Sequence, residues 1–161
     1  MWPRLALALS ACGLLAWACP GEPRADIEAS IQRSLAATRI EDIDAYMAEI
    51  PRDLVLHQDD GTTTDYAALR ADVLQQWSII EKTNSLETTI DRFELEPDGT
   101  ALVWTSGRWE RVMLGRDGVS RHIVLTTQTH KETWRCRDGR WFNLDIEELG
   151  GQVWVDGVLQ S

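Results

Sequence analysis

The sequence is poor in basic residues. Its 161 residues include 16 Lys and Arg against 26 Asp and Glu, which gives a formal net charge of −10. No run of Lys or Arg interrupts this excess, so the sequence offers no patch that would attract a phosphate backbone. Nucleic acid is therefore not an expected partner. The hydrophobic content of 43% is enough for the core of one globular domain.

Cysteine and the common catalytic motifs are also scarce. Three Cys are too few for a disulfide framework. The sequence has no Gly-rich phosphate loop, no Gly-x-Ser-x-Gly elbow and no His-Glu-x-x-His helix. Nucleotide binding, serine-hydrolase chemistry and the common zinc-peptidase chemistry therefore lack support. We expect no metal and no cofactor.

Long apolar runs are limited to the N-terminus. The stretch from Leu5 to Ala18 is too short and too interrupted to span a membrane. With Arg4 before it and small residues near its end, the stretch resembles an export signal. We therefore expect residues 1–18 to form a signal peptide and residues 19–23 a tether, in a protein exported to the periplasm or cell envelope. The alternative is an apolar N-terminal helix that is not cleaved.

The first residue after the expected signal is Cys19. Residues 15–19 (LAWAC) resemble a bacterial lipobox, so we expect Cys19 to be lipidated and to anchor the protein to the membrane. Cys12 follows a better local match, but it would leave a very short signal. Simple cleavage after Ala18 remains open. If Cys19 carries lipid, Cys136 has no partner within the chain, and we expect it to be a small packed residue without a disulfide or zinc.

Helical patterns occupy the first half of the domain. Apolar residues at helical spacing predict a helix that starts at Arg24 and a shorter one over residues 40–50. A strand over residues 53–57 leads to a turn at 59–61, and Asp65 is expected to cap a third helix. The apolar positions of the three helices are Ile27, Ile31 and Leu35, then Ile43, Tyr46, Met47 and Ile50, then Leu69, Val73, Leu74, Trp77 and Ile80.

Strands follow for the rest of the chain. Three Asp-Gly turns divide four predicted strands, at residues 87–95, 101–114, 121–136 and 141–149. Residues 150–161 either add an edge strand or close one end of the sheet. This order predicts an α+β domain over residues 24–149, in which a curved antiparallel sheet carries about three helices on its concave face.

The last hairpin, TWRCRDGRWFNLDIEEL (residues 133–149), allows two registers. A two-residue loop at Asp138-Gly139 would place Arg137 opposite Arg140 and Glu132 opposite Asp145, which are like-charge pairs. A three-residue loop with a left-handed Gly139 in a bulge avoids both clashes. It pairs Lys131 with Asp145, Thr133 with Asn143, Trp134 with Phe142 and His130 with Ile146. We take this second register.

This register sorts the two strands by face. Trp134, Phe142, Leu144 and Ile146 are expected to point toward the helices, and Lys131, Thr133, Asn143 and Asp145 away. Along the preceding strand the inward set is Glu132, His130, Gln128, Thr126, Val124 and His122. Such a polar run either lines a cavity or is interrupted by a bulge that reverses the two faces.

Over residues 24–149 the sequence resembles the nuclear transport factor 2-like superfamily. The resemblance is carried by the helix from Arg24, the helix at 40–50, the DLVLHQDDG segment before Asp65 and the closing Asp-Gly-x-Trp hairpin. That superfamily includes ketosteroid isomerase, scytalone dehydratase and polyketide cyclases. The resemblance implies a cone whose mouth accepts a small, often apolar ligand, and a possible homodimer through the outer face of the sheet. At the position of the general-base Asp of ketosteroid isomerase this chain has His57-Gln58-Asp59, and near the position of that enzyme's Tyr it has Ser34. Isomerase chemistry is therefore not supported.

Two His are the candidate catalytic residues. His57, at the end of the first strand, could act as a general base, and so could His130 on the inward face of its strand. Their alternatives are an exposed strand-end His and a hydrogen-bonded inner-sheet His. The candidate ligand-binding residues are Trp77, Trp104, His122, Gln128, Glu132 and Trp134. For the Trp residues the alternative is ordinary core packing.

Three functions fit these expectations. The first is an exported module that binds a small apolar or amphipathic molecule between the helices and the sheet. The second is a lyase, isomerase or hydrolase that uses a His as acid or base. The third is a structural accessory protein that acts through its sheet face.

Overall fold

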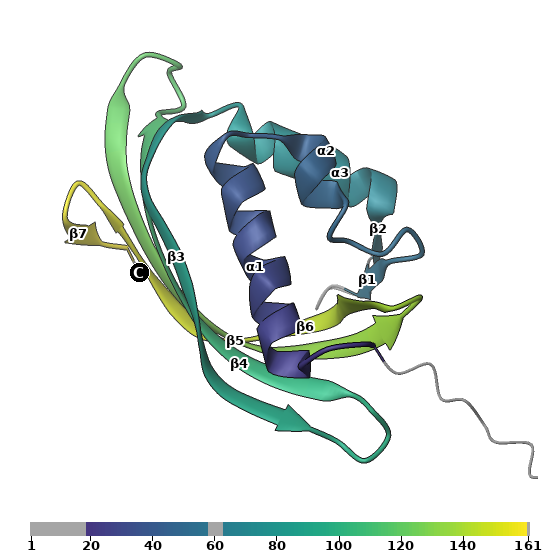
Figure 1. Cartoon of the computed structure of the whole chain (residues 1–161). Coiled ribbons are helices and arrows are strands. Elements are labelled where there is room, and N and C mark those ends of the chain that lie inside the picture. The colour runs from purple at the N-terminus through teal and green to yellow at the C-terminus, as the bar shows by residue number, and fades with distance from the viewer. Residues whose placement is uncertain (1–18, 58–62, 161) are drawn as a thin grey trace, which may run out of the picture.

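The computed structural model describes residues 19–57 and 63–160. The first half contains α1 (Pro23–Arg39), α2 (Ile43–Met47), β1 (Val55–His57), β2 (Thr63–Asp65) and α3 (Tyr66–Trp77). The second half contains β3 (Ile80–Leu95), β4 (Ala101–Leu114), β5 (Arg121–Arg137), β6 (Arg140–Val155) and β7 (Val158–Leu159). β1 and β2 form a hairpin, and β3 to β7 form one antiparallel sheet in sequence order. The sheet curves around α1, with α2 and α3 beyond it (Figure 1), which confirms the predicted α+β class.

Short-range chemistry fixes where the helices begin. A carboxylate at each N-cap accepts a hydrogen bond from a backbone N–H in the first turn, at 2.7–3.0 Å, through the pairs Glu22 to Ala25, Asp42 to Ala45 and Asp65 to Ala68. The cap at Asp65 confirms the predicted start of α3. The cap at Asp42 explains why α2 is shorter than the predicted helix over residues 40–50.

The strands extend further than the turn signals indicated. β4 has the predicted bounds, whereas β3 begins at Ile80, soon after α3 ends. β6 runs through residues 150–155 and then pairs with β7, so the tail forms part of the sheet. Within the described ranges, no helix combines the length and apolar character needed to cross a membrane.

The core lies between α1 and the narrow end of the sheet. Ile27 on α1 is fully buried against Ala101 and Val103 on β4, together with Trp134 and Trp141. The helix stripes were predicted correctly at Leu35, Met47, Val73 and Trp77, which are all buried, but Leu74 is exposed. These contacts hold α1 across the concave face and leave a space further along the helix.

The predicted hairpin register is wrong. Asp138 and Gly139 both have positive φ, of 50° and 76°, and they form a two-residue turn that places Arg137 opposite Arg140. The like charges are tolerated because each Arg has its own partner: Arg137 pairs with Asp53, and Arg140 with Glu49. The left-handed Gly139 was predicted correctly, but it does not form a three-residue loop.

A bulge removes the second expected clash. The register shifts at Leu144, so Thr133 faces Asp145, Glu132 faces Ile146 and Trp134 faces Asn143. Lys131 therefore pairs with Glu147, at 3.7 Å, and not with Asp145. The two-residue turn, which comes before this bulge, also reverses two of the predicted faces. Asn143 lines the concave side, and Phe142 packs under Arg140.

The expectation that Cys136 has no partner within the chain is contradicted, whereas lipidation of Cys19 stays a prediction. Cys19, just before α1, forms a disulfide with Cys136 near the end of β5, so Cys136 does have a partner within the chain. Lipidation of Cys19 would require the same sulfur atom. A chain with this disulfide is therefore not anchored through Cys19.

Candidate functional site

A cavity of about 290 Å³ lies between the three helices and the concave face of the sheet. Its wall includes the apolar side chains Ile31, Leu35, Ile50, Val73, Trp77, Leu86 and Ile146. Polar groups join them from both layers: Ser30, Ser34, Thr38 and Glu49 from the helical side, and Thr105, Arg111, His130, Glu132 and Asn143 from the sheet. Mixed lining of this kind is typical of small-molecule sites.

Glu132 is a buried acid on the sheet side of the cavity, with an exposed fraction of 7%. Thr105 Oγ1 donates to its Oε1 at 2.9 Å, and Trp134 Nε1 and Asn143 Nδ2 donate to its Oε2 at 2.8 and 3.0 Å. Burial raises the pKa of Glu132 above its ordinary value, and the hydrogen bonds from Thr105 and Trp134 and the nearby His130 oppose this only in part. The result is an oriented carboxyl group with a greater affinity for a proton than a surface Glu.

The strand geometry explains how these groups meet. β4 and β5 pair without interruption, and Thr105 lies opposite His130. Side chains two residues apart share a face, so His130, Glu132 and Trp134 all reach the concave side. Four of the predicted site residues, Trp77, His130, Glu132 and Trp134, therefore line one cavity.

The other predicted site residues lie elsewhere. Trp104 is on the outer face of the sheet, where Arg92 and Lys131 stack on its ring. His122 pairs with Asp156 through Nδ1 at 2.8 Å, near the β6–β7 turn. Gln128 lines a separate surface depression with Thr126, Glu148 and Gln152. None of these three residues lines the cavity. His122 and Gln128 were included because the predicted inward run followed period two past the region that the helices cover.

The remaining predicted site residue, His57, cannot be placed relative to the cavity. Its backbone pairs with Thr63 in the β1–β2 hairpin. Its side chain lies outside the described part of the structure, so a role as general base stays a prediction. The predicted turn at residues 59–61 also falls outside the described residues.

Several cavity residues were missed by sequence reasoning. Tyr46 on α2 packs edge-on against Trp77, with ring centroids 5.8 Å apart. Burial raises the pKa of Tyr46, and Arg111 opposes that shift. Arg111 and Trp109 follow Ala101, Val103 and Thr105 on β4 with a period of two. That alternation was the available signal, because it places all five on one face.

Glu49 forms a structural ion cluster at the helical wall. Ser30 Oγ donates to it at 2.7 Å, and Arg33 and Arg140 contact it at 2.8 and 3.3 Å. Burial alone would raise the pKa of Glu49. The hydrogen bonds from Arg33 and Ser30 and the charges of both arginines outweigh burial and hold the pKa below its ordinary value.

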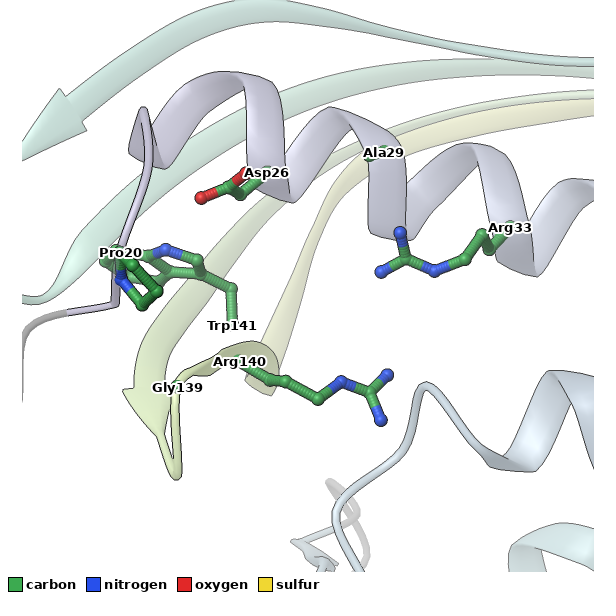
Figure 2. Close-up of a pocket in the computed structure, with 7 residues that line it drawn as sticks. All are labelled: Pro20, Asp26, Ala29, Arg33, Gly139, Arg140 and Trp141. Atoms are coloured by element: carbon green, nitrogen blue, oxygen red, sulfur yellow. The ribbon is translucent and has the colours of Figure 1, made fainter.

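The same arginines border a second, smaller pocket of about 160 Å³ beside the N-terminal part of α1. Figure 2 shows Arg33 from α1 and Arg140 from β6 extending into this space, with Trp141 and Asp26 at its other end. Both guanidinium groups already bind Glu49. This pocket therefore offers a ligand less unpaired charge than the cavity between the helices and the sheet, which we call the cone cavity. Across the described ranges, no group of three or more His, Cys, Asp or Glu is arranged to hold a metal ion.

Comparison with known proteins supports the fold. No model of a known protein family matches the sequence, and no curated protein matches it. Solved structures do match. A proposed scytalone dehydratase from Novosphingobium aromaticivorans has a TM-score of 0.65 at 11% identity, over 80% of this chain and 85% of that one.

Two further structures extend this comparison. A nuclear transport factor 2-like protein of unknown function from Shewanella oneidensis gives a TM-score of 0.57 at 19% identity, over 79% of this chain and 98% of that one. A type 2 hexachlorocyclohexane dehydrochlorinase gives 0.63 at 13% identity, over 82% and 88%. The fold is thus that of nuclear transport factor 2-like proteins, as the sequence resemblance implied. Identities this low show the fold alone.

Proposed function

We propose that the protein binds a small, partly apolar molecule in the cone cavity. The observation that carries this proposal is the cavity of about 290 Å³, with apolar walls from the helices and a few polar groups from the sheet. Its size is near the lower end of small-molecule sites, which span about 300–1,000 Å³. It fits a ligand of one or two rings better than a nucleotide or a peptide.

A pocket-filling variant tests this function. Ser34 lies on the cavity side of α1, so Ser34→Phe should occupy the space, whereas Gln32→Phe on the exposed face of the same helix is the matched control. Calorimetric titration with neutral 2-naphthamide should detect binding to wild type and Gln32→Phe, and weaker binding to Ser34→Phe by about tenfold or more. Equal binding to all three proteins, or none to wild type, would contradict the proposal.

A second candidate function is acid–base catalysis in the same cavity. The supporting observation is the raised pKa of Glu132, in a buried position on the same strand face as His130. A carboxyl group whose pKa is raised takes up a proton more readily than an ordinary Glu and can return it to a bound ligand. Two of the similar structures carry names that denote eliminations, a dehydratase and a dehydrochlorinase.

Proton exchange distinguishes an enzyme from a simple binding protein. The carbon acid 2-tetralone, incubated in D₂O, should exchange its α protons faster with wild type than in buffer. Glu132→Gln should remove the acceleration, while His130→Ala should reduce it. Exchange at the buffer rate with wild type would leave binding as the function.

We also propose export of the protein to an oxidising compartment. The disulfide between Cys19 and Cys136 supports this, because such bonds persist outside the reducing cytosol. Fractionation of the producing cell should find the protein beyond the inner membrane, starting after residue 18 and without lipid. Recovery of the reduced, uncleaved chain from the cytosol would refute export.

A further inference from the structure

The cone cavity contains a cation that forms no ion pair with the described residues. Arg111 is near the end of β4, and its guanidinium carbon lies 5.2 Å from the ring centroid of Trp109. Its Nε is buried without a hydrogen bond, and within the part of the chain that the structure describes the guanidinium makes no ion pair. By contrast, Arg33 and Arg140 both pair with Glu49, which lines the helical side of the cavity.

Such an arrangement is costly for the free protein. Removing a charge from water without a counter-charge destabilises the charged form, and burial accordingly lowers the pKa of Arg111. Glu41 and Tyr46 oppose this shift, although neither is within ion-pair or hydrogen-bond distance. The guanidinium still carries its charge at neutral pH. A bound anion would offset the cost of desolvation.

A second donor without an acceptor lies beside it. Trp109 Nε1 is buried and makes no hydrogen bond with the described residues. A Cβ at Gly107 would lie 3.4 Å from this nitrogen, so the indole is packed against the glycine. Trp109 and Arg111 share one face of β4 and line the same cavity. Two buried donors in this part of the cavity, Arg111 Nε and Trp109 Nε1, therefore have no acceptor among the described residues.

The opposite end of the cavity has the reverse character. The Glu132 carboxyl group is bound by Thr105, six residues from Arg111 along β4, which is roughly 20 Å in an extended strand. Apolar side chains, including Leu35, Val73 and Trp77, lie in the wall between the helices and the sheet. A ligand with one charged end and an apolar body would therefore bind in one orientation only.

We propose that the cavity binds an organic carboxylate, with the carboxylate on the guanidinium of Arg111 and the apolar body toward Trp77 and Val73. The planar guanidinium can donate two parallel hydrogen bonds to a carboxylate, which fixes the angle of approach as well as the charge. This inference rests on the proposed binding function and adds the chemical class of the ligand. It also explains why an acidic protein keeps an arginine inside its pocket.

The test compares two probes of the same shape, 2-naphthoate and neutral 2-naphthamide, by calorimetric titration of the full chain. Wild type should bind the carboxylate about 10- to 100-fold more tightly than the amide. Arg111→Met, which keeps an apolar stem, should lose this preference, so that its affinity for the carboxylate falls to about its affinity for the amide. Arg111→Lys should keep part of the preference, since it retains the charge without the planar fork. Thermal melts establish that each variant is folded.

The outcomes separate the two proposals. Equal affinity of wild type for both probes would leave the binding function intact and overturn the carboxylate inference. A preference that persists in Arg111→Met would place the anion elsewhere and also overturn it. Binding of neither probe would refute the binding function, and the inference with it.

Discussion

The disulfide should contribute a large part of the stability of the domain. Cys19 and Cys136 are 117 residues apart, and in the chain-entropy model closing a loop of this length stabilises the fold by about 5 kcal/mol. The measured effect should be smaller, because residual structure in the reduced, unfolded chain lowers the entropy that the bond removes. We expect a loss of about 2–4 kcal/mol in the free energy of unfolding.

Thermal unfolding followed by circular dichroism provides the assay. For a domain of this size, 1 kcal/mol corresponds to about 3–4 °C, so the double variant Cys19→Ser/Cys136→Ser should melt about 6–15 °C below the oxidised wild type. Reductant should lower the melting temperature of wild type and leave the double variant unchanged. Mass spectrometry of proteolytic fragments should find the two cysteines in one linked peptide. Free thiols at both positions, with equal melting temperatures, would refute the reasoning.

Three further predictions concern local interactions. Glu49→Gln should lower the free energy of unfolding by about 1–3 kcal/mol at pH 7. The pKa of Glu49 is depressed in the folded state, so the loss of stability in the variant should be complete above the pKa of Glu49 in the unfolded chain. It should vanish as the pH falls through the pKa of Glu49 in the folded protein. Urea titrations at several pH values would detect this dependence. Asp65→Ala should cost about 1 kcal/mol by removing the cap to the Ala68 N–H, with Asp72→Ala on the exposed face of α3 as control, and an equal effect of both would contradict it. Gly139→Val should cost about 1–3 kcal/mol in denaturant melts because of its positive φ, and no loss would show that the turn adapts.

Local signals predicted most of the fold. The period of the apolar residues identified Ile27 and Leu35 as buried positions of α1, and Asp-Gly turns gave the bounds of β4. These features depend on neighbouring residues, which the sequence displays directly. The bounds of α2 and β3 were less accurate, because Asp42 and Ile80 take their roles from the cap and from pairing with β4.

Long-range partners explain what the sequence could not provide. The two-residue register was rejected because it places Arg137 opposite Arg140, but Asp53 and Glu49, which lie 84 and 91 positions earlier, neutralise the two arginines. The bulge at Leu144 then removes the other clash. No local pattern reveals such partners, and the same limit concealed the disulfide.

The candidate site was predicted in part for the same reason. His130, Glu132 and Trp134 were found because period two along one strand places them together. Trp104 was assigned to the ligand site by residue type alone, and it lies on the opposite face. Arg111 was missed because an arginine close to a turn is typical of an exposed strand end, whereas the curvature of the sheet brings it under α2.

The most direct test of ligand binding in the cone cavity uses the indole N–H signals in a nitrogen–proton correlation NMR spectrum, assigned by single Trp→Phe variants. On addition of 2-naphthoate, the signals of Trp77, Trp109 and Trp134, which line the cavity, should shift in a saturable manner. Trp104, on the outer face of the sheet, serves as the internal control and should not move. A saturable shift at Trp104 with no change at the three cavity residues would contradict the account.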